Sequence, residues 1–278
     1  MQDFVEEDGS GHESFDEDDC WTPLQRASRD GDLPAVQAAI ASGADVNAPP
    51  QGYYGRTALQ AACLARHAGV VSALLAAGAD VDAAPGNNDA RNALQIASGQ
   101  ADRGIVTMLL DKGADVNAPA TRYCGLTALQ SACDAGLADI VGLLLEKGAD
   151  VNAMPATTAG RTALQAAARG GFSSIAKLLV ERGADVNAPA CRHKGFTALQ
   201  AASYHGHEGL VRMLVEAGAD VDAEGSRFKG GRALHAAAEG GHLRMTQTTT
   251  STRTSAESAD QHGTREPLVP PARDVSGI

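Results

Sequence analysis

The sequence predicts an all-α solenoid of helix-turn-helix units that stack side by side and are joined by hairpin loops. A motif that opens on a leucine and closes on Gly-Ala-Asp-Val recurs at an interval of 35 residues. A single unit of this length cannot bury its own apolar face and must stack on a neighbour. The array therefore sets the architecture, and the residues that vary between copies carry any specificity. The opening leucines are Leu24, Leu59, Leu94, Leu129, Leu164, Leu199 and Leu234, and the closing glycines are Gly43, Gly78, Gly113, Gly148, Gly183 and Gly218.

The first helix of each unit is predicted to be short and thin. In the copy at residues 57–82, Thr57 can cap this helix through its hydroxyl. The apolar face that follows consists mainly of alanine and one leucine, namely Ala58, Leu59, Ala61 and Ala62. Such small side chains suit helices that pack closely on one another.

A second helix follows a turn at residues 66–69. Its apolar side chains fall at i, i+1, i+4 and i+5, which places them on one side of a helix. Gly78 ends this helix, because glycine adopts the left-handed C-terminal cap without steric cost. Residues 79–82 are too polar and too short for another helix and are predicted to form an extended turn. The apolar stripe consists of Val70, Val71, Leu74 and Leu75.

Six full copies and half of a seventh occupy residues 20–245. Arg26 stands where later copies have small or apolar side chains, which suits a first unit whose outer side meets water. In the seventh copy, Thr249 and Thr250 replace the two leucines of the stripe, so its second helix is predicted to be missing or frayed. Two explanations stay open: a truncated array, or a coding sequence that departs from its ancestral frame.

Both ends of the chain are predicted to be disordered. The net charge is −11, yet residues 1–19 alone hold nine acidic side chains and no Lys or Arg, so the rest of the chain is nearly neutral. Such a block repels itself and lacks apolar periodicity. Residues 246–278 are rich in Ser, Thr and Pro and form the second predicted tail.

The cysteines and the hydropathy bear on the compartment. Five cysteines occur without a CxxC pair, and no charged-then-apolar signal segment precedes them. Reduced thiols in an intracellular protein, cytoplasmic or nuclear, are therefore expected. No apolar run approaches the roughly 18 residues that a membrane helix needs, so no membrane association is predicted.

The repeated unit resembles the ankyrin repeat, which reads Gly-x-Thr-Pro-Leu-His, two helices, and then Gly-Ala-Asp-Val-Asn. The matching stretches include residues 22–25, residues 125–130 and residues 113–117, and the resemblance covers about residues 20–245. The chain is therefore expected to form an ankyrin-repeat α-solenoid of about six and a half repeats. Three departures stand out: the period is 35 against a usual 33, Gln replaces His except at His235, and Ala replaces Pro except at Pro23.

The two additional residues and the glutamines can both be interpreted. Ten steps separate Asn47 from Thr57, and the same holds in later copies, so the insertion lies in the hairpin loop between units. A longer surface loop costs only a few tenths of a kcal/mol in closure entropy. Gln can donate and accept hydrogen bonds as His can, so it can tie the start of the first helix to the neighbouring loop.

The resemblance implies a binding face made of the loop tips, the residue before each Thr, and the two residues that close the first helix. Seven of the ten aromatic residues of the chain fall at these positions, and aromatic and Arg side chains often dominate interface energy. The alternative is that loop tips tolerate any residue and that aromatics are excluded from an alanine-lined core. The predicted partner-binding residues are Trp21, Tyr53, Tyr54, Arg56, Leu64, Arg122, Tyr123, Leu126, Arg169, Arg192, His193, Lys194, Phe196, Tyr204, His205, Arg227, Phe228 and Lys229.

These positions predict a monomeric, non-catalytic scaffold or adaptor that binds a partner protein. The basic loop tips favour an acidic or phosphorylated partner segment. The tail at residues 1–19 is expected to be solvated and to aid solubility, and the alternative is that it competes for the same face. Two alternatives stay open: the chain is the sensing or ligand-binding part of a larger multidomain protein, or, with less support, it binds nucleic acid. The latter is disfavoured because the pI is about 5.1 and no nucleic-acid-binding motif occurs.

Catalysis, metals and cofactors are not predicted. The chain contains no GxxxxGK[ST], GxSxG or HExxH motif. The recurring aspartates, such as Asp80 and Asp115, belong to the repeated turn. Cys63 and Cys133 occupy one repeat position and are predicted to be small buried side chains. The spacing of Cys191, His193, His205 and His207 fits no known metal site.

Overall fold

A computed structural model describes residues 21–50, 55–84, 86, 91–121, 125–156, 160–191, 195–224 and 232–242. All regular structure in these ranges is helical, which confirms the all-α prediction. The two predicted tails and the second helix of the seventh repeat lie outside the described residues. The first helices of the repeats are α1 (Pro23–Asp30), α3 (Ala58–Leu64), α5 (Ala93–Ser98), α7 (Ala128–Asp134), α9 (Ala163–Gly170), α11 (Ala198–Tyr204) and α13 (Ala233–Glu239). The second helices are α2 (Leu33–Ala41), α4 (Ala68–Ala76), α6 (Arg103–Asp111), α8 (Ala138–Glu146), α10 (Ser173–Glu181) and α12 (Glu208–Glu216).

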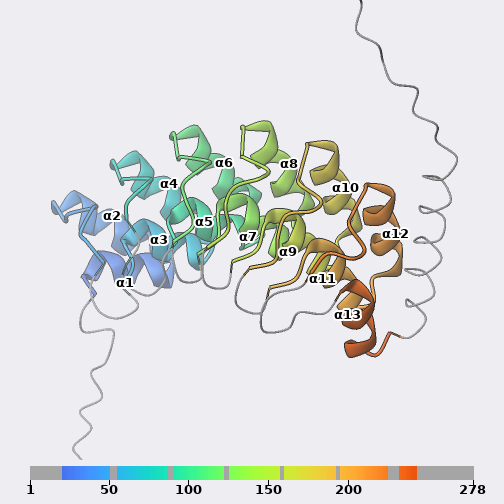
Figure 1. Cartoon of the computed structure of the whole chain (residues 1–278). Coiled ribbons are helices and arrows are strands. Elements are labelled where there is room, and N and C mark those ends of the chain that lie inside the picture. The colour runs from blue at the N-terminus through green and yellow to red at the C-terminus, as the bar shows by residue number, and fades with distance from the viewer. Residues whose placement is uncertain are drawn as a thin grey trace, which may run out of the picture.

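The helices form two layers along the array, one of odd-numbered and one of even-numbered helices (Figure 1). Each odd-numbered helix packs on the next odd-numbered helix, and these contacts are more extensive than those between successive even-numbered helices. The alanine-rich faces of the first helices permit this close approach. Since one layer packs more closely than the other, the array curves with the first helices on its inner side.

The predicted caps and the predicted role of glutamine are both confirmed. In the first six repeats a Thr or Asn side chain accepts from the backbone N–H of the Gln three residues later, and the Gln side chain accepts from the backbone of the capping residue. The Gln amide also donates to the loop that follows the repeat. Gln60 Nε2, for example, donates to the carbonyl oxygens of Ala83 and Ala84 at 3.0 and 3.3 Å. Each glutamine therefore fixes both the helix start and the loop base.

The second helices bury the predicted stripe. Val70, Val71 and Leu74 are fully buried in a continuous apolar core that runs through the repeats. After α4 the chain turns at Gly78, whose φ of +86° is in the left-handed region that favours glycine. In the turn that follows, the Asp80 carboxylate accepts from the Asp82 N–H at 3.1 Å. The recurring aspartates thus have the structural role that the repeat predicted.

An asparagine at the end of the turn links neighbouring repeats at four of the junctions, a feature that we did not predict. Asn47 accepts from the Asp80 N–H at 2.8 Å and donates through Nδ2 to the Gly78 carbonyl at 3.2 Å. The same two bonds recur at Asn117, Asn152 and Asn187. Asp82 occupies this position in the second repeat, and its carboxylate only accepts, from the Asp115 N–H at 3.2 Å.

A second link places a ring over a glycine of the preceding repeat. The Gly136 turn has φ +73°, and a Cβ built there would lie 2.5 Å from the Phe172 ring. His67, His207 and His242 cover Gly31, Gly171 and Gly206 in the same way. Among the described residues, the two non-glycine positions with positive φ are Arg66 and Ala101. The residue of the next repeat that would cover the turn is Asp102 for Arg66 and Leu137 for Ala101, and neither carries a ring. Glycine is thus used where a ring covers the turn.

The two ends of the described array differ from its middle. Arg26 is exposed, as predicted for the outer side of the first repeat. In α13 the capping position is Arg232, which forms no side-chain cap hydrogen bond. Leu234 is 41 % exposed, whereas Leu199 in the preceding repeat is 1 % exposed. The seventh repeat therefore keeps its first helix but not the cap and burial of the others.

Candidate partner-binding surface

The predicted binding face is only partly within the described residues. The residues that lie there are Trp21, Arg56, Leu64, Leu126, Arg169, Phe196, Tyr204 and His205, and each is half-buried or exposed. All of them belong to the first helices or to the residues directly before or after these helices, which form the inner layer. The loop-tip residues Tyr53, Tyr54, Arg122, Tyr123, Arg192, His193, Lys194, Arg227, Phe228 and Lys229 lie outside the described residues.

At the first repeat, an aromatic and a cationic side chain lie together. The Arg29 guanidinium lies over the Trp21 ring, 5.5 Å from its centroid, a cation–π arrangement. The Arg29 Nε also donates to the exposed Asp30 carboxylate at 2.9 Å. This bond is the main reason that the pKa of Asp30 is lowered. Sequence reasoning identified Trp21 but missed Arg29.

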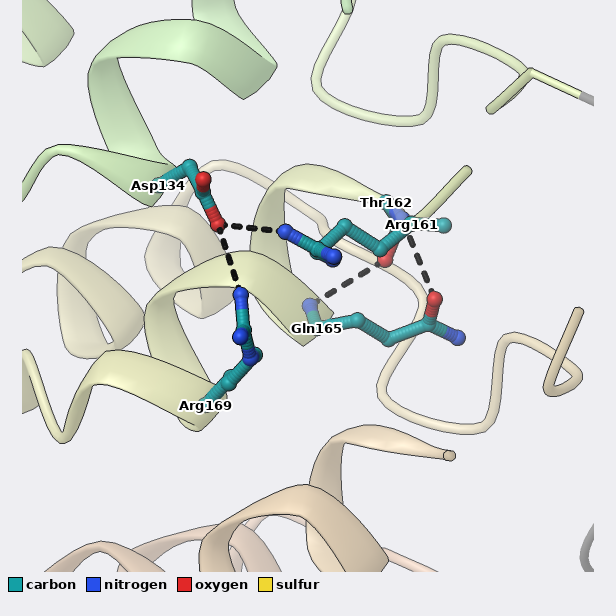
Figure 2. Close-up of polar contacts among 5 residues, drawn as sticks. All are labelled: Asp134, Arg161, Thr162, Gln165 and Arg169. Atoms are coloured by element: carbon teal, nitrogen blue, oxygen red, sulfur yellow. Dashed lines mark hydrogen bonds and ion pairs between the residues drawn. The ribbon is translucent and has the colours of Figure 1, made fainter. Parts of the chain in front are cut away.

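In the middle of the array, one carboxylate lies between two arginines. Asp134 Oδ1 accepts from Arg161 at 2.6 Å and lies 3.8 Å from Arg169 (Figure 2). Asp134 comes from the end of α7, whereas Arg161 precedes α9 and Arg169 lies in the last turn of α9, so the contact joins two repeats. The Asp134 and Arg161 side chains are 33 % and 30 % exposed. A cluster of one carboxylate and two guanidiniums keeps a net positive charge that faces solvent.

Figure 2 also shows how the cap of α9 holds this cluster. Thr162 follows Arg161, and its backbone N–H donates to the Gln165 side chain at 3.1 Å (Figure 2). The Gln165 amide donates in turn to the carbonyls of Ala188 and Pro189 at 3.0 Å. The backbone that carries Arg161 is therefore fixed by the same capping network that starts the helix.

Aromatic side chains gather in the sixth repeat. The Phe196 and Tyr204 rings are stacked, with centroids 5.3 Å apart, and His205 meets Tyr204 edge-on at 5.1 Å. Burial lowers the pKa of His205, and the neighbouring His207, Arg169 and His242 lower it further. His205 is therefore neutral at pH 7. An apolar aromatic surface thus lies next to the Arg161–Arg169 cluster.

Ligands for a metal ion do not converge on this surface. In the part of the chain that the structure describes, no group of three or more His, Cys, Asp or Glu side chains could hold a metal. Cys63 and Cys133 are fully buried, and burial raises the pKa of the Cys63 thiol to about 12. Both thiols are therefore protonated at neutral pH. Among the same residues, no helix has the length and apolar character needed to cross a bilayer.

Comparison with known families accounts for the repeat. The sequence model described as ankyrin repeats in three copies matches five overlapping stretches, at residues 8–85, 24–120, 81–155, 101–190 and 154–225. The chain belongs to the ankyrin-repeat family. Ankyrin repeats are generally protein–protein interaction modules. The predicted fold, a solenoid of ankyrin repeats, is thereby confirmed.

A solved ankyrin array has the same fold. The crystal structure of the human ASB11 ankyrin repeat domain superposes with a TM-score of 0.63 at 24 % sequence identity. The match covers 81 % of this chain and 98 % of that one. No match was found among curated proteins. The similarity to ASB11 concerns the fold, and the inner-layer side chains of this ankyrin array have to be interpreted from its own residues.

Proposed function

We propose that this ankyrin array is a non-catalytic scaffold or adaptor that binds an acidic or phosphorylated protein segment through its inner face and loop tips. The observation that carries the proposal is the concentration of arginine and aromatic side chains on the first-helix layer. Arg161 and Arg169 present guanidinium groups beside the stacked Phe196 and Tyr204 rings. Guanidinium groups bind carboxylates and phosphates through paired hydrogen bonds, and aromatic rings supply contact area.

The second-helix layer offers a contrast within the same molecule. In α10 and α12 its charged side chains are of both signs and form the Lys177–Glu181 and Arg212–Glu208 pairs. Such exposed i,i+4 pairs contribute little energy and are typical of a solvated face. The asymmetry between the layers therefore favours the inner layer as the partner-binding side.

The proposal includes a monomeric array in an intracellular compartment, cytoplasm or nucleus. The free thiols of Cys63 and Cys133, buried in separate helices, are consistent with a reducing environment. Sedimentation at several protein concentrations tests the oligomeric state, since a mass that rises with concentration contradicts a monomer.

Affinity capture from a lysate tests the proposed function. The inner-face variant carries Arg169→Ala and Tyr204→Ala, and the matched control carries Lys177→Ala and Arg212→Ala on the second-helix layer. Circular dichroism establishes that both are folded. We expect the inner-face variant, but not the control, to lose the partner. Equal capture by the two variants would place the partner elsewhere on the molecule.

A further inference from the structure

One position in each repeat, directly before the capping residue of the first helix, forms a row along the inner layer. The first helices pack side by side, so the residues that precede them follow one another across six repeats. All six side chains are half-buried. We call this set the inner row, and it consists of Trp21, Arg56, Arg91, Leu126, Arg161 and Phe196.

Three members of the inner row are held by side chains from the ends of first helices. Trp21 lies under Arg29, and Phe196 stacks on Tyr204 at 5.3 Å. Arg161 is bound by Asp134 of the preceding repeat at 2.6 Å. A side chain that is already positioned loses less conformational entropy when a ligand binds. The row is thus a partly pre-organised surface.

The chemistry of the inner row favours an acidic ligand. Three of its six side chains are guanidinium groups, the other three are apolar or aromatic, and none is acidic. Two described carboxylates lie at the row, and each is already bound to an arginine: Asp134 contacts Arg161, and Asp30 contacts Arg29, which lies over Trp21. A ligand with carboxylates opposite the arginines and apolar groups between them would complement this order of charge.

The spacing of the row limits the shape of that ligand. Packed helices lie about 8–10 Å apart. A polyproline II segment rises about 3.1 Å per residue with three residues per turn, so every third side chain points the same way after about 9 Å. One turn of such a segment therefore matches one repeat. A β-strand fits less well, because its side chains alternate between faces with a period of two.

We propose that the inner row binds an extended acidic segment of a partner protein, with one side chain per repeat at every third residue. Carboxylates lie opposite Arg56, Arg91 and Arg161, and apolar side chains lie opposite Leu126 and Phe196. The proposal rests on the proposed function and adds a sequence pattern for the partner: acid, acid, apolar, acid, apolar, in one chain direction or the other, with two residues between each.

Synthetic peptides test this pattern on the full chain. One peptide has Glu, Glu, Leu, Glu and Leu at every third residue, a second has the reverse order, and a third has the same composition with these residues at every second position. Fluorescence anisotropy at physiological salt measures each dissociation constant. We expect one of the two period-three peptides to bind at least about tenfold more tightly than the period-two peptide, a difference of one decade in Kd.

A charge exchange tests the register. Arg91→Glu should weaken binding of the preferred peptide by about tenfold, and replacing the facing Glu of the peptide by Lys should restore it. Arg212→Glu on α12 is the control and should leave binding unchanged, because Arg212 lies in the second-helix layer. Restoration by the exchanged peptide cannot come from a variant that fails to fold.

Four outcomes would overturn the inference: equal binding of period-three and period-two peptides, no effect of Arg91→Glu, binding of a phosphoserine peptide but not of its Glu counterpart, or tighter binding of a single-stranded oligonucleotide. These outcomes are distinguishable from failure of the proposed function. If the inner-face variant of the capture experiment loses its partner while the peptides fail, the array still binds protein through its inner layer, but not by this pattern.

Discussion

Replacing Asp82 by Asn should stabilise the array at the junction between the second and third repeats. In the four repeats that have Asn at this position, the side chain accepts one backbone hydrogen bond at 2.8 Å and donates another at 3.0–3.2 Å. The Asp82 carboxylate has no hydrogen to donate, and its two oxygens lie 3.2 Å from the single Asp115 N–H. Asp82→Asn therefore adds one bond to the link between these repeats.

The expected gain is about 1 kcal/mol. One neutral hydrogen bond contributes roughly 0.5–1.5 kcal/mol. The substitution also removes one of three carboxylates near this turn. The Asp80 carboxylate accepts from the Asp82 N–H, and the Asp82 carboxylate accepts from the N–H of Asp115, the third acidic residue. Relief of that repulsion adds a few tenths of a kcal/mol at a surface site. It is offset by weaker acceptance from the Asp115 N–H, because a charged acceptor binds more strongly than a neutral one.

Urea denaturation and native-state hydrogen exchange measure the effect. The exchange of α5 and α6 amides is the sharper readout, because repeat arrays do not always unfold in one step. Asn117→Asp is the reciprocal control and should destabilise its own junction by a similar amount. If Asp82→Asn leaves exchange in α5 and α6 unchanged while Asn117→Asp accelerates exchange at its own junction, the amide donation does not limit stability at Asp82, and the reasoning fails.

Three further predictions follow, and the first is a matched pair of substitutions at two repeat-equivalent positions. Gly136→Ala should lower the unfolding free energy by about 2 kcal/mol or more, because the new Cβ would lie 2.5 Å from the Phe172 ring at a φ of +73°. The reverse change at the equivalent position of the preceding repeat, Ala101→Gly, should raise the unfolding free energy by roughly 0.5–1 kcal/mol, because Ala101 has a φ of +59° and no ring lies above it. Ser98→Ala should raise the unfolding free energy by about 1 kcal/mol, because the buried hydroxyl has no hydrogen-bond partner. The Cys63 thiol, with its pKa raised to about 12 by burial, should resist a thiol reagent at pH 8 in the folded protein and react after unfolding.

Denaturation midpoints check the first two of these predictions, and a timed reaction with a chromogenic disulfide checks the third. A Gly136→Ala protein as stable as wild type would mean that the ring can move aside at little cost. A less stable Ser98→Ala protein would mean that the hydroxyl has a partner in solution. Rapid labelling of Cys63 in native buffer would show frequent local opening of α3.

Features internal to one repeat could be predicted from the sequence, because each recurs with the same neighbours. The Thr57 cap, the tie from Gln60 to the next loop, and the left-handed turn at Gly78 all follow from residue types at fixed offsets. The glutamine interpretation succeeded because its amide donates as His does. The structure confirmed these assignments without change.

Features that join two repeats were missed, although their signals are periodic. Asn47 and Gly78 belong to different copies, so their bond is visible only when the copies are stacked. The ring of Phe172 over Gly136 needs the same information. The sequence also shows Arg66 at the glycine position and Asp102 at the corresponding ring position. The connection between the two replacements becomes clear only when the stacked repeats bring these positions together.

The candidate site was harder to predict because it lies at variable positions. Residues before the helix caps were identified through the family resemblance, and the structure places them in one layer. Asp134 was missed, since its repeat position also holds Arg29, Leu64, Arg169 and Tyr204, and no common chemistry marks it. Its contact with Arg161 crosses from one repeat to the next, so residue type alone could not reveal it.

The two links between repeats are independent of each other, yet both are altered at the same junction. Between the second and third repeats, the ring link is absent because Arg66 stands at the glycine position and Asp102 at the ring position. At the same junction the asparagine link is reduced because Asp82 replaces Asn. One link lies at the start of a second helix and the other in the turn after it, so a single local substitution does not explain both. In a linear array, each interface contributes its own share of stability, and among the junctions between the first six repeats this one is expected to open first.

That weak junction lies beneath the proposed binding row. Arg56 precedes the second repeat's first helix and Arg91 the third's, so a ligand that contacts both would span the interface where the internal links are reduced. A ligand that binds only the closed arrangement stabilises it in proportion to its concentration over Kd. The free energy needed to close the junction in molecules where it is open reduces the ligand's apparent affinity by the same amount. Asp82→Asn should therefore tighten binding of an inner-row ligand through stability alone, although residue 82 lies outside the row.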